Sequence, residues 1–283
     1  MATFPVYNSN TPPKRVGSYE FEEMLGQGGM GKVWKGRHTL LDEPIVIKEL
    51  IINEPENVEQ FKYEAKILYR NIRHPSFPTV KDYFEYGGHY FLVMDLIPGI
   101  SMQKLIESHS SLDFDTVCWI ADRILAGLVY IHRYGVVHRD IKPSNILLDL
   151  TDHRAVLVDF GIAKSPRIAP KTQKVSKKFF TPHMASPEQY AGAPTTPLSD
   201  IYSLGATMYY ALTGHLPPEA APGLKDEDIP PPQSLNPLIH DQLSQVVLKA
   251  MKVNPKDRFQ SAEEMKRVTN KVRDLLHQCQ STP

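Results

Sequence analysis

The feature that most constrains the fold is a change of pattern at Pro98-Gly99. Before this pair, short alternating apolar stretches bounded by Gly, Pro or Asp predict β-strands, together with one amphipathic helix at about residues 56–72. After it, apolar residues recur at helical spacing, most clearly over residues 115–134 and 200–213. The sequence therefore predicts an α+β fold of two lobes. A small antiparallel-sheet lobe carries one main helix, and the larger lobe is mostly helical.

The same change sets the expected domain limits. Residues 1–18 are rich in proline and polar residues and lack periodicity, which predicts a flexible tail. Residues 19–97 are expected to form the small lobe and residues 98–283 the large one. The strands expected in the small lobe are residues 19–25, 33–38, 45–50, 79–86 and 90–94.

Charge and cysteine usage exclude several classes of protein. The chain has 32 basic and 32 acidic residues, so no overall field would attract nucleic acid or a membrane surface. Cys118 and Cys279 lie far apart, which argues against a disulfide framework and fits a reducing compartment. The apolar run 201–216 is short for a membrane span and predicts a buried helix capped by Ser199 or Asp200. Since no signal peptide is visible either, we expect a cytoplasmic location and no nucleic-acid partner.

A glycine-rich run lies between two predicted strands. Glycines let the backbone approach a polyphosphate closely, although a plain hairpin turn would have the same composition. A strand containing Val33 follows the run, whereas a dinucleotide-binding Rossmann loop would lead into a helix. A Walker loop is excluded as well, because no Gly-Lys-Ser/Thr opens a helix. The residues of the expected phosphate loop are Gly26, Gln27, Gly28, Gly29, Met30 and Gly31.

Lys48 follows the apolar residues of the strand predicted at 45–50, and its role has two interpretations. By itself it would be a solvated edge residue. However, Glu64 lies beside the apolar face of the helix at 56–72, where a carboxylate needs a cation to offset its desolvation. We therefore expect Lys48 to pair with Glu64 and to reach the phosphates.

A dense polar stretch at residues 137–145, with Asp159 after the next short strand, supplies the remaining chemistry. Phosphoryl transfer needs an acceptor for the hydroxyl proton, a role that Asp140 fits. It also needs oxygen ligands for Mg²⁺, for which Asn145 and Asp159 qualify, and cations near the γ-phosphate, for which Lys142 joins Lys48.

In order and spacing this set resembles the protein kinase signature over about residues 19–275. The resemblance implies a two-lobed kinase fold, ATP with Mg²⁺ (Mn²⁺ as a substitute), and phosphate transfer to protein substrates. Lys142-Pro143 and Thr181 are similar to the serine/threonine branch, in which such a threonine bonds the catalytic aspartate and lysine. Met184–Gln189 resembles bacterial-type members. The matching residues are Gly26, Gly28, Gly31, Val33, Lys48, Glu64, His138, Arg139, Asp140, Asn145, Asp159, Phe160 and Gly161.

The resemblance also implies an adenine site. Met94 corresponds to the gatekeeper, and Asp95 and Ile97 to residues that offer backbone groups to the base. An apolar sandwich around the base would be formed by Val33, Val46 and Leu147.

A second set of residues is implied to be structural. Glu188 resembles the glutamate that pairs with an arginine near the end of the domain, here Arg258. Asp200 resembles the aspartate that accepts bonds from the backbone of the His138-Arg139 turn. His138 is expected to stack under Phe160.

Two departures from the family pattern keep other functions open. Val46 stands where alanine is usual and would narrow the adenine pocket. The proline-rich segment 217–232 replaces a substrate-docking helix, which we expect to be shortened or missing. The alternatives are a pseudokinase that scaffolds partners and a small-molecule phosphotransferase of related fold.

Regulation is expected in the segment between Asp159 and Glu188, which is basic and lacks acidic residues. We expect autophosphorylation at Thr172 or Ser176, which would attract Arg139. The resemblance also leaves open a homodimer through the small lobe and a longer, membrane-anchored kinase of which this chain is the cytosolic domain.

Overall fold

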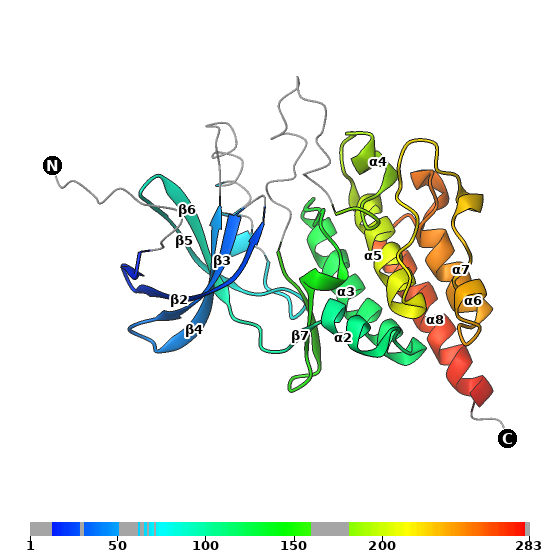
Figure 1. Cartoon of the computed structure of the whole chain (residues 1–283), viewed down its shortest axis with the longest axis horizontal. Helices are drawn as coiled ribbons and strands as arrows, with labels where there is room; N and C mark the ends of the chain where they lie inside the picture. Colours follow the sequence, from blue (N-terminus) through cyan, green and yellow to red (C-terminus); the bar gives the residue numbers. More distant parts are fainter. Residues whose placement is uncertain are drawn as a thin grey trace. The chain divides into compact units, whose positions relative to one another are not determined.

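The computed structural model describes residues 13–28, 31–50, 62, 65–66, 68–70, 72–159 and 181–280. The chain divides into two compact units (Figure 1). The sheet unit comprises residues 1–73 and 78–97, and the helical unit residues 74–77 and 98–283. One limit therefore lies between Ile97 and Pro98, close to the change of pattern in the sequence. The short segment 74–77 belongs to the helical unit instead of the small lobe, because the Leu157 N–H donates to the Ser76 carbonyl (2.8 Å).

The sheet unit contains an antiparallel sheet in the order β1-β2-β3-β4-β6-β5. Apolar and aromatic residues alternate with polar ones in the longer strands, and the Gly87-Gly88 turn joins the last two as predicted. In the predicted helix at 56–72, the described residues 62, 65–66 and 68–70 are helical. The strands are β1 (Arg15–Val16), β2 (Tyr19–Gly28), β3 (Gly31–His38), β4 (Glu43–Leu50), β5 (Val80–Tyr86) and β6 (His89–Asp95).

The predicted tail at residues 1–18 is wrong for its last part. Arg15 and Val16 form β1 and pair with Glu20 and Tyr19 of β2. Gly17 has a φ of 57°, which glycine adopts without a Cβ clash, so the chain reverses in two residues. Residues 1–12 lie outside the described residues.

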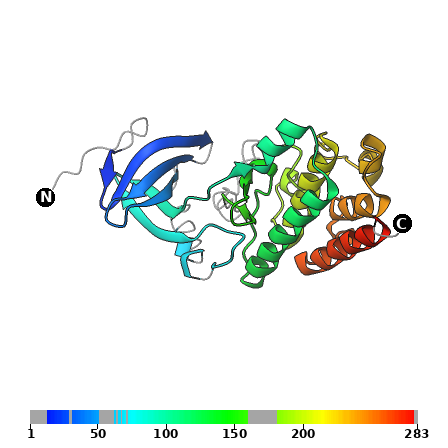
Figure 2. The same cartoon turned by 90° about the horizontal axis from the view of Figure 1, so that it is seen from below.

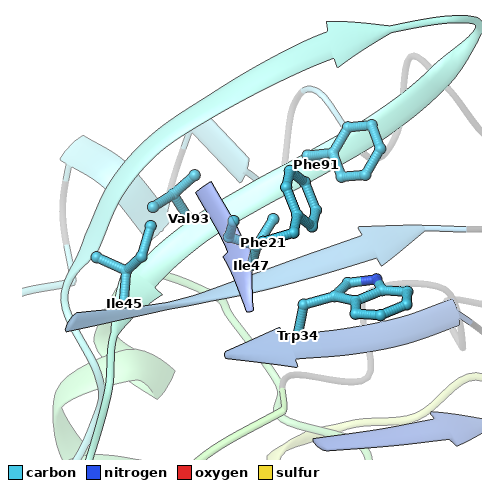
Figure 3. Close-up of a cluster of buried hydrophobic side chains, with 6 residues drawn as sticks. All are labelled: Phe21, Trp34, Ile45, Ile47, Phe91 and Val93. Atoms are coloured by element: carbon cyan, nitrogen blue, oxygen red, sulfur yellow. The ribbon is translucent and has the colours of Figure 1, made fainter. Parts of the chain in front are cut away.

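One face of the sheet carries the apolar core of this unit (Figure 3). Ile45 and Ile47 are fully buried, and because side chains alternate along a strand, Val46 and Lys48 point to the other face of β4. Strand alternation thus fixes the side of the sheet on which the predicted phosphate-binding lysine lies. The core residues are Phe21, Trp34, Ile45, Ile47, Phe91 and Val93.

The helical unit combines a small three-stranded sheet with a bundle in which α3 packs against α5 and α8 (Figure 2). Asp113 caps α3 by accepting the Thr116 N–H (2.9 Å). No helix in the described part of the chain is both long and apolar enough to cross a lipid bilayer. The elements are β7 (Ile100–Ser101), α2 (Met102–His109), α3 (Phe114–Arg133), η1 (Pro143–Asn145), β8 (Ile146–Asp149), β9 (Arg154–Leu157), α4 (Pro187–Tyr190), α5 (Pro197–Thr213), η4 (Asp226–Asp228), α6 (Pro232–Leu235), α7 (Asp241–Ala250), η5 (Pro255–Asp257) and α8 (Ala262–Gln280).

The prediction that Ser199 or Asp200 caps α5 is wrong. The helix begins earlier, at Pro197, and Thr196 is its N-cap, accepting the Leu198 N–H (3.2 Å). Proline is favoured at the first helical position, because its fixed φ suits the helix and its missing N–H needs no partner there. The Asp200 carboxylate is thereby left for a bond outside the helix.

The proline-rich segment 217–232 contains the single 3₁₀ turn η4 before the four-residue helix α6 begins at Pro232. Proline removes N–H donors and blocks the helix interior, so a longer helix cannot form here. The structure agrees with the prediction that no long helix occupies this segment.

Candidate active site

Asp200 fixes the loop that carries Asp140. The N–H groups of His138 and Arg139 donate to the two Asp200 oxygens at 2.8 and 2.9 Å. Arg139 has a φ of 71°, an uncommon value for a residue with a side chain, and this sharp turn aims both N–H groups at one carboxylate. Burial opposes ionisation of Asp200, but the bonds from His132 and the Arg139 N–H outweigh it, so its pKa is lowered. A buried anion therefore holds the turn.

Three side chains hold the Asp140 carboxylate, which is itself largely buried. Thr181 donates its hydroxyl to Oδ1 (3.1 Å), and the Lys142 ammonium lies 3.1 Å from Oδ2. Lys142 also donates to the Thr181 hydroxyl (3.1 Å), which closes a ring of three groups. Asn145 Nδ2 donates to Asp140 Oδ2 (3.1 Å) and to its carbonyl (2.9 Å). The carboxylate is thus fixed in direction next to a cation.

Asn145 and Asp159 offer oxygen atoms suited to a hard cation. Asn145 uses its amide nitrogen on Asp140, so its Oδ1 is directed elsewhere. The Val158 N–H donates to the Asn145 carbonyl (2.8 Å), which brings Asp159 next to this residue in space. An amide and a carboxylate oxygen, completed by phosphate and water, are the donors that Mg²⁺ prefers. The oxygen donors of Asn145 and Asp159 therefore suit Mg²⁺.

A buried ion pair anchors the segment that follows Thr181. Arg258 is fully buried and donates to both Glu188 oxygens at 2.8 Å. Burial alone would raise the pKa of Glu188, but Arg258 and the Ser199 hydroxyl lower it. Arg258 also lies over the Tyr202 ring and donates to the Leu198 carbonyl. This bidentate pair fixes the end of the segment to the helices.

In the sheet unit, the glycine-rich run forms the end of the β2–β3 hairpin. Gly26 is paired with Val33 and Gly28 with Gly31, so a strand follows the glycines as expected. Lys48 is only 9% exposed and lies opposite Val33 in the neighbouring strand. An ammonium buried in a sheet requires polar surroundings, which disfavours the solvated-edge interpretation.

The predicted adenine contacts are divided between the two units. Met94 of β6 is buried and paired with Val46. The Asp95 N–H donates to the Thr79 carbonyl (3.1 Å), and Asp95 is paired with Ile45 at the end of β6. Ile97 is buried at the end of the sheet unit, whereas Leu147 lies in β8 of the helical unit, half-buried.

Residues 19–280 match the protein-family model described as protein kinase domain. The chain belongs to the protein kinase domain family. It is 32% identical over 257 residues to the probable serine/threonine-protein kinase PknB of Lactococcus lactis, covering 87% of this chain and 40% of that protein. It is 33% identical over 266 residues to the serine/threonine-protein kinase pkn3 of Myxococcus xanthus, covering 88% and 48%. The kinase domain thus spans less than half of each relative.

A solved structure supports the fold of the kinase domain. The crystal structure of Rad53 1–466 in complex with AMP-PNP matches with a TM-score of 0.70 and 22% identity, over 88% of this chain and 64% of that one. The predicted two-lobed kinase-like fold and the resemblance to bacterial-type serine/threonine kinases are confirmed.

Some predicted residues of the kinase domain lie outside the described residues, and their roles stay predictions. These are Gly29, Met30, Glu64, Phe160, Gly161, Thr172 and Ser176. The expected stacking of His138 under Phe160 is among them.

Two contacts of the kinase domain were missed by the sequence analysis. His132, near the end of α3, lies 2.9 Å from Asp200 through Nε2 and completes the support of the loop. Arg139 donates through Nε to the Thr195 hydroxyl (3.1 Å), in the loop before α5. No local pattern predicts either contact, because the two partners are more than 50 residues apart in the chain.

Proposed function

We propose that the chain is the catalytic domain of a serine/threonine protein kinase, which transfers the γ-phosphate of ATP to hydroxyl groups of proteins. The observation that carries this proposal is the set of bonds from Thr181, Lys142 and Asn145 to the Asp140 carboxylate. A carboxylate so oriented accepts the proton of an attacking hydroxyl, and the adjacent ammonium stabilises charge on the transferred phosphate.

The nucleotide is proposed to be bound by the glycine hairpin and by Lys48, supported by Glu64. Asn145 and Asp159 would hold Mg²⁺, which neutralises phosphate charge when bound. Met94, Asp95, Ile97, Val33, Val46 and Leu147 are proposed to surround the adenine. The AMP-PNP bound to Rad53 is consistent with an adenine nucleotide here. The methyls of Val46 would narrow this site without blocking it.

Control of activity is proposed to act through Arg139, which holds the Thr195 hydroxyl in the structure. A phosphate on Thr172 or Ser176 would be a stronger partner than a neutral hydroxyl, because it carries charge and three acceptor oxygens. The resemblance to bacterial-type kinases supports a cytoplasmic site of action for this domain, either by itself or within a longer membrane-anchored kinase. It also supports a homodimer through the sheet unit, which sedimentation at increasing concentration would test.

The test is incorporation of labelled phosphate from ATP–Mg²⁺ into a generic protein. Asp140→Asn keeps the shape of the side chain but removes the base, and is expected to lower the rate by about 10²–10⁴-fold. Asp152→Asn, on an exposed turn of the same unit, is the matched control and should change little. Equal incorporation by wild type and Asp140→Asn would contradict the proposed role. ATP–Mg²⁺ binding without any transfer would favour the pseudokinase alternative.

A further inference from the structure

His183 is held in an unusual conformation two residues after Thr181. Its φ is 67°, a left-handed value that costs free energy for a residue with a side chain and persists only where surrounding contacts fix it. Its Nδ1 lies 2.7 Å from the Pro217 carbonyl oxygen. Since a carbonyl only accepts, Nδ1 carries the proton. In the neutral ring Nε2 is therefore an acceptor with a fixed direction.

The carboxylate of Glu219 lies near His183 Nε2. Its Oε2 accepts the Tyr190 hydroxyl (3.2 Å), and its Oε1 is 3.8 Å from His183 Nε2, beyond hydrogen-bonding distance. Burial raises the pKa of Tyr190, and a backbone bond from His183 opposes this effect. Together with the charge of Glu219, burial brings the pKa to about 12, so the hydroxyl stays a donor. The side chains of His183 and Glu219 are 33% and 38% exposed. Two acceptors on partly exposed side chains thus lie next to each other.

His183 follows two residues after Thr181, which contacts the proposed catalytic group. Thr181 donates to Asp140 at 3.1 Å, and two residues of chain span at most about 7 Å. A substrate bound with its hydroxyl at Asp140 would therefore bring side chains within about three residues of that hydroxyl close to His183 and Glu219.

Resting on the proposed kinase function, we propose that His183 and Glu219 form a subsite for the side chain of a lysine or arginine in the protein substrate. These are the two side chains that carry positive charge and only donate hydrogen bonds, so each satisfies both acceptors and offsets the Glu219 charge. The shortened segment that begins at Pro217 supplies both the carbonyl that orients His183 and the carboxylate. The subsite thus depends on the region where this chain departs from the family pattern.

A segment of suitable chemistry occurs in the chain itself. Residues 168–178 contain the candidate phosphorylation sites Thr172 and Ser176, surrounded by lysines and without an acidic residue. A second copy of the chain would present this segment as a substrate. The four lysines are Lys171, Lys174, Lys177 and Lys178.

The experiment compares kcat/KM of the full chain for two peptides. One has the sequence of residues 168–178, and the other has its four lysines replaced by glutamine. Wild type is expected to prefer the lysine peptide at least fivefold, the effect of one partly exposed charge pair of about 1 kcal/mol. Glu219→Gln is expected to bring the ratio close to one, and Glu219→Lys to reverse it. Glu227→Gln removes an exposed carboxylate of η4 and is the matched control, with the wild-type ratio retained.

Thermal unfolding of each variant establishes that it is folded. His183→Asn tolerates the left-handed conformation and is expected to lower the ratio as well. A wild-type ratio of one, or a ratio unchanged in both Glu219 variants, would overturn the subsite while the kinase function stands. Failure of wild type to phosphorylate either peptide or a generic protein would instead overturn the proposed function, and with it the subsite.

Discussion

The sheet unit and the helical unit place their functional side chains in different ways. In the sheet unit the core is apolar, and strand alternation alone puts Lys48 on the face opposite Ile47. Among the described residues of the helical unit, Arg258 has the largest fully buried side chain, and Asp200 is only 1% exposed. Strand alternation thus positions Lys48, whereas charged bonds between distant parts of the chain position the loop that carries Asp140.

The native state of the helical unit also depends on electrostatics. Several carboxyl groups of the helical unit have a lowered pKa because basic side chains or N–H groups outweigh their burial. Such groups are stabilised as anions, so the native state of this unit depends on their ionisation. Those in the described part of the helical unit are Asp113, Asp122, Asp149, Glu188, Asp200, Asp226 and Glu264.

The chain offers a reporter for each unit, since it has two tryptophans. Trp34 lies in the apolar core of the sheet unit, and Trp119 lies in α3 of the helical unit. Trp119→Phe therefore leaves fluorescence from the sheet unit, and Trp34→Phe leaves fluorescence from the helical unit.

The largest effect is expected from Arg258→Met. It leaves the Glu188 carboxylate buried without its bidentate partner and should lower the free energy of unfolding of the helical unit by about 4 kcal/mol. Urea unfolding followed by Trp119 measures the loss. Arg267→Met, at an exposed position of α8, is the control and should cost less than about 0.5 kcal/mol. A similar loss in both variants would remove the special role of the buried pair.

The next largest effect is expected from Ile45→Ala, which leaves a cavity in the core of the sheet unit. Ile45 is fully buried and is not the cross-strand partner of Trp34, so the reporter is retained. The loss should be about 3 kcal/mol, measured in urea through Trp34. Leu40→Ala, at a 76% exposed position, is the control. If Trp119 reports the same loss as Trp34, the two units unfold as one and the comparison fails.

Acid should weaken the helical unit. Glu188 and Asp200 have pKa values below their ordinary values of 4.5 and 3.8, so the stability that they provide is complete above about pH 4.5. It is lost as the pH falls through the lowered values, because protonation then removes the bonds to Arg258 and to the His138-Arg139 turn. Urea midpoints from Trp119 should fall with acid below pH 4.5. The double variant Glu188→Gln/Arg258→Met should show a weaker dependence, and an equal one would exclude this pair as a cause.

The smallest effect is expected at the corrected cap of α5. Thr196→Ala removes the oxygen that accepts the Leu198 N–H and should cost about 1 kcal/mol in the Trp119 curve. Thr196→Ser keeps this oxygen and should retain nearly all of the stability. Equal losses in the two variants would show that the cap bond is not what stabilises the start of α5.

The secondary structure followed from local patterns wherever the period was clear. The strands around Val33 and Lys48 and the long helix α3 lie where alternation and helical spacing predicted them. The errors fall at ends and short pieces: β1, and the start of α5 at Pro197. A two-residue strand has no period to detect, and the choice among several capping residues depends on which of them is needed elsewhere.

The sequence by itself determined the division into a sheet part and a helical part and the family of the chain, because period and motif spacing are local properties. Only the tertiary structure decided which carboxylate supports which loop. Asp200 reaches a turn about 60 residues earlier in the chain, and His183 meets a carbonyl 34 residues later. Such contacts depend on how helices pack, and packing brings together residues whose separation in the chain carries no signal.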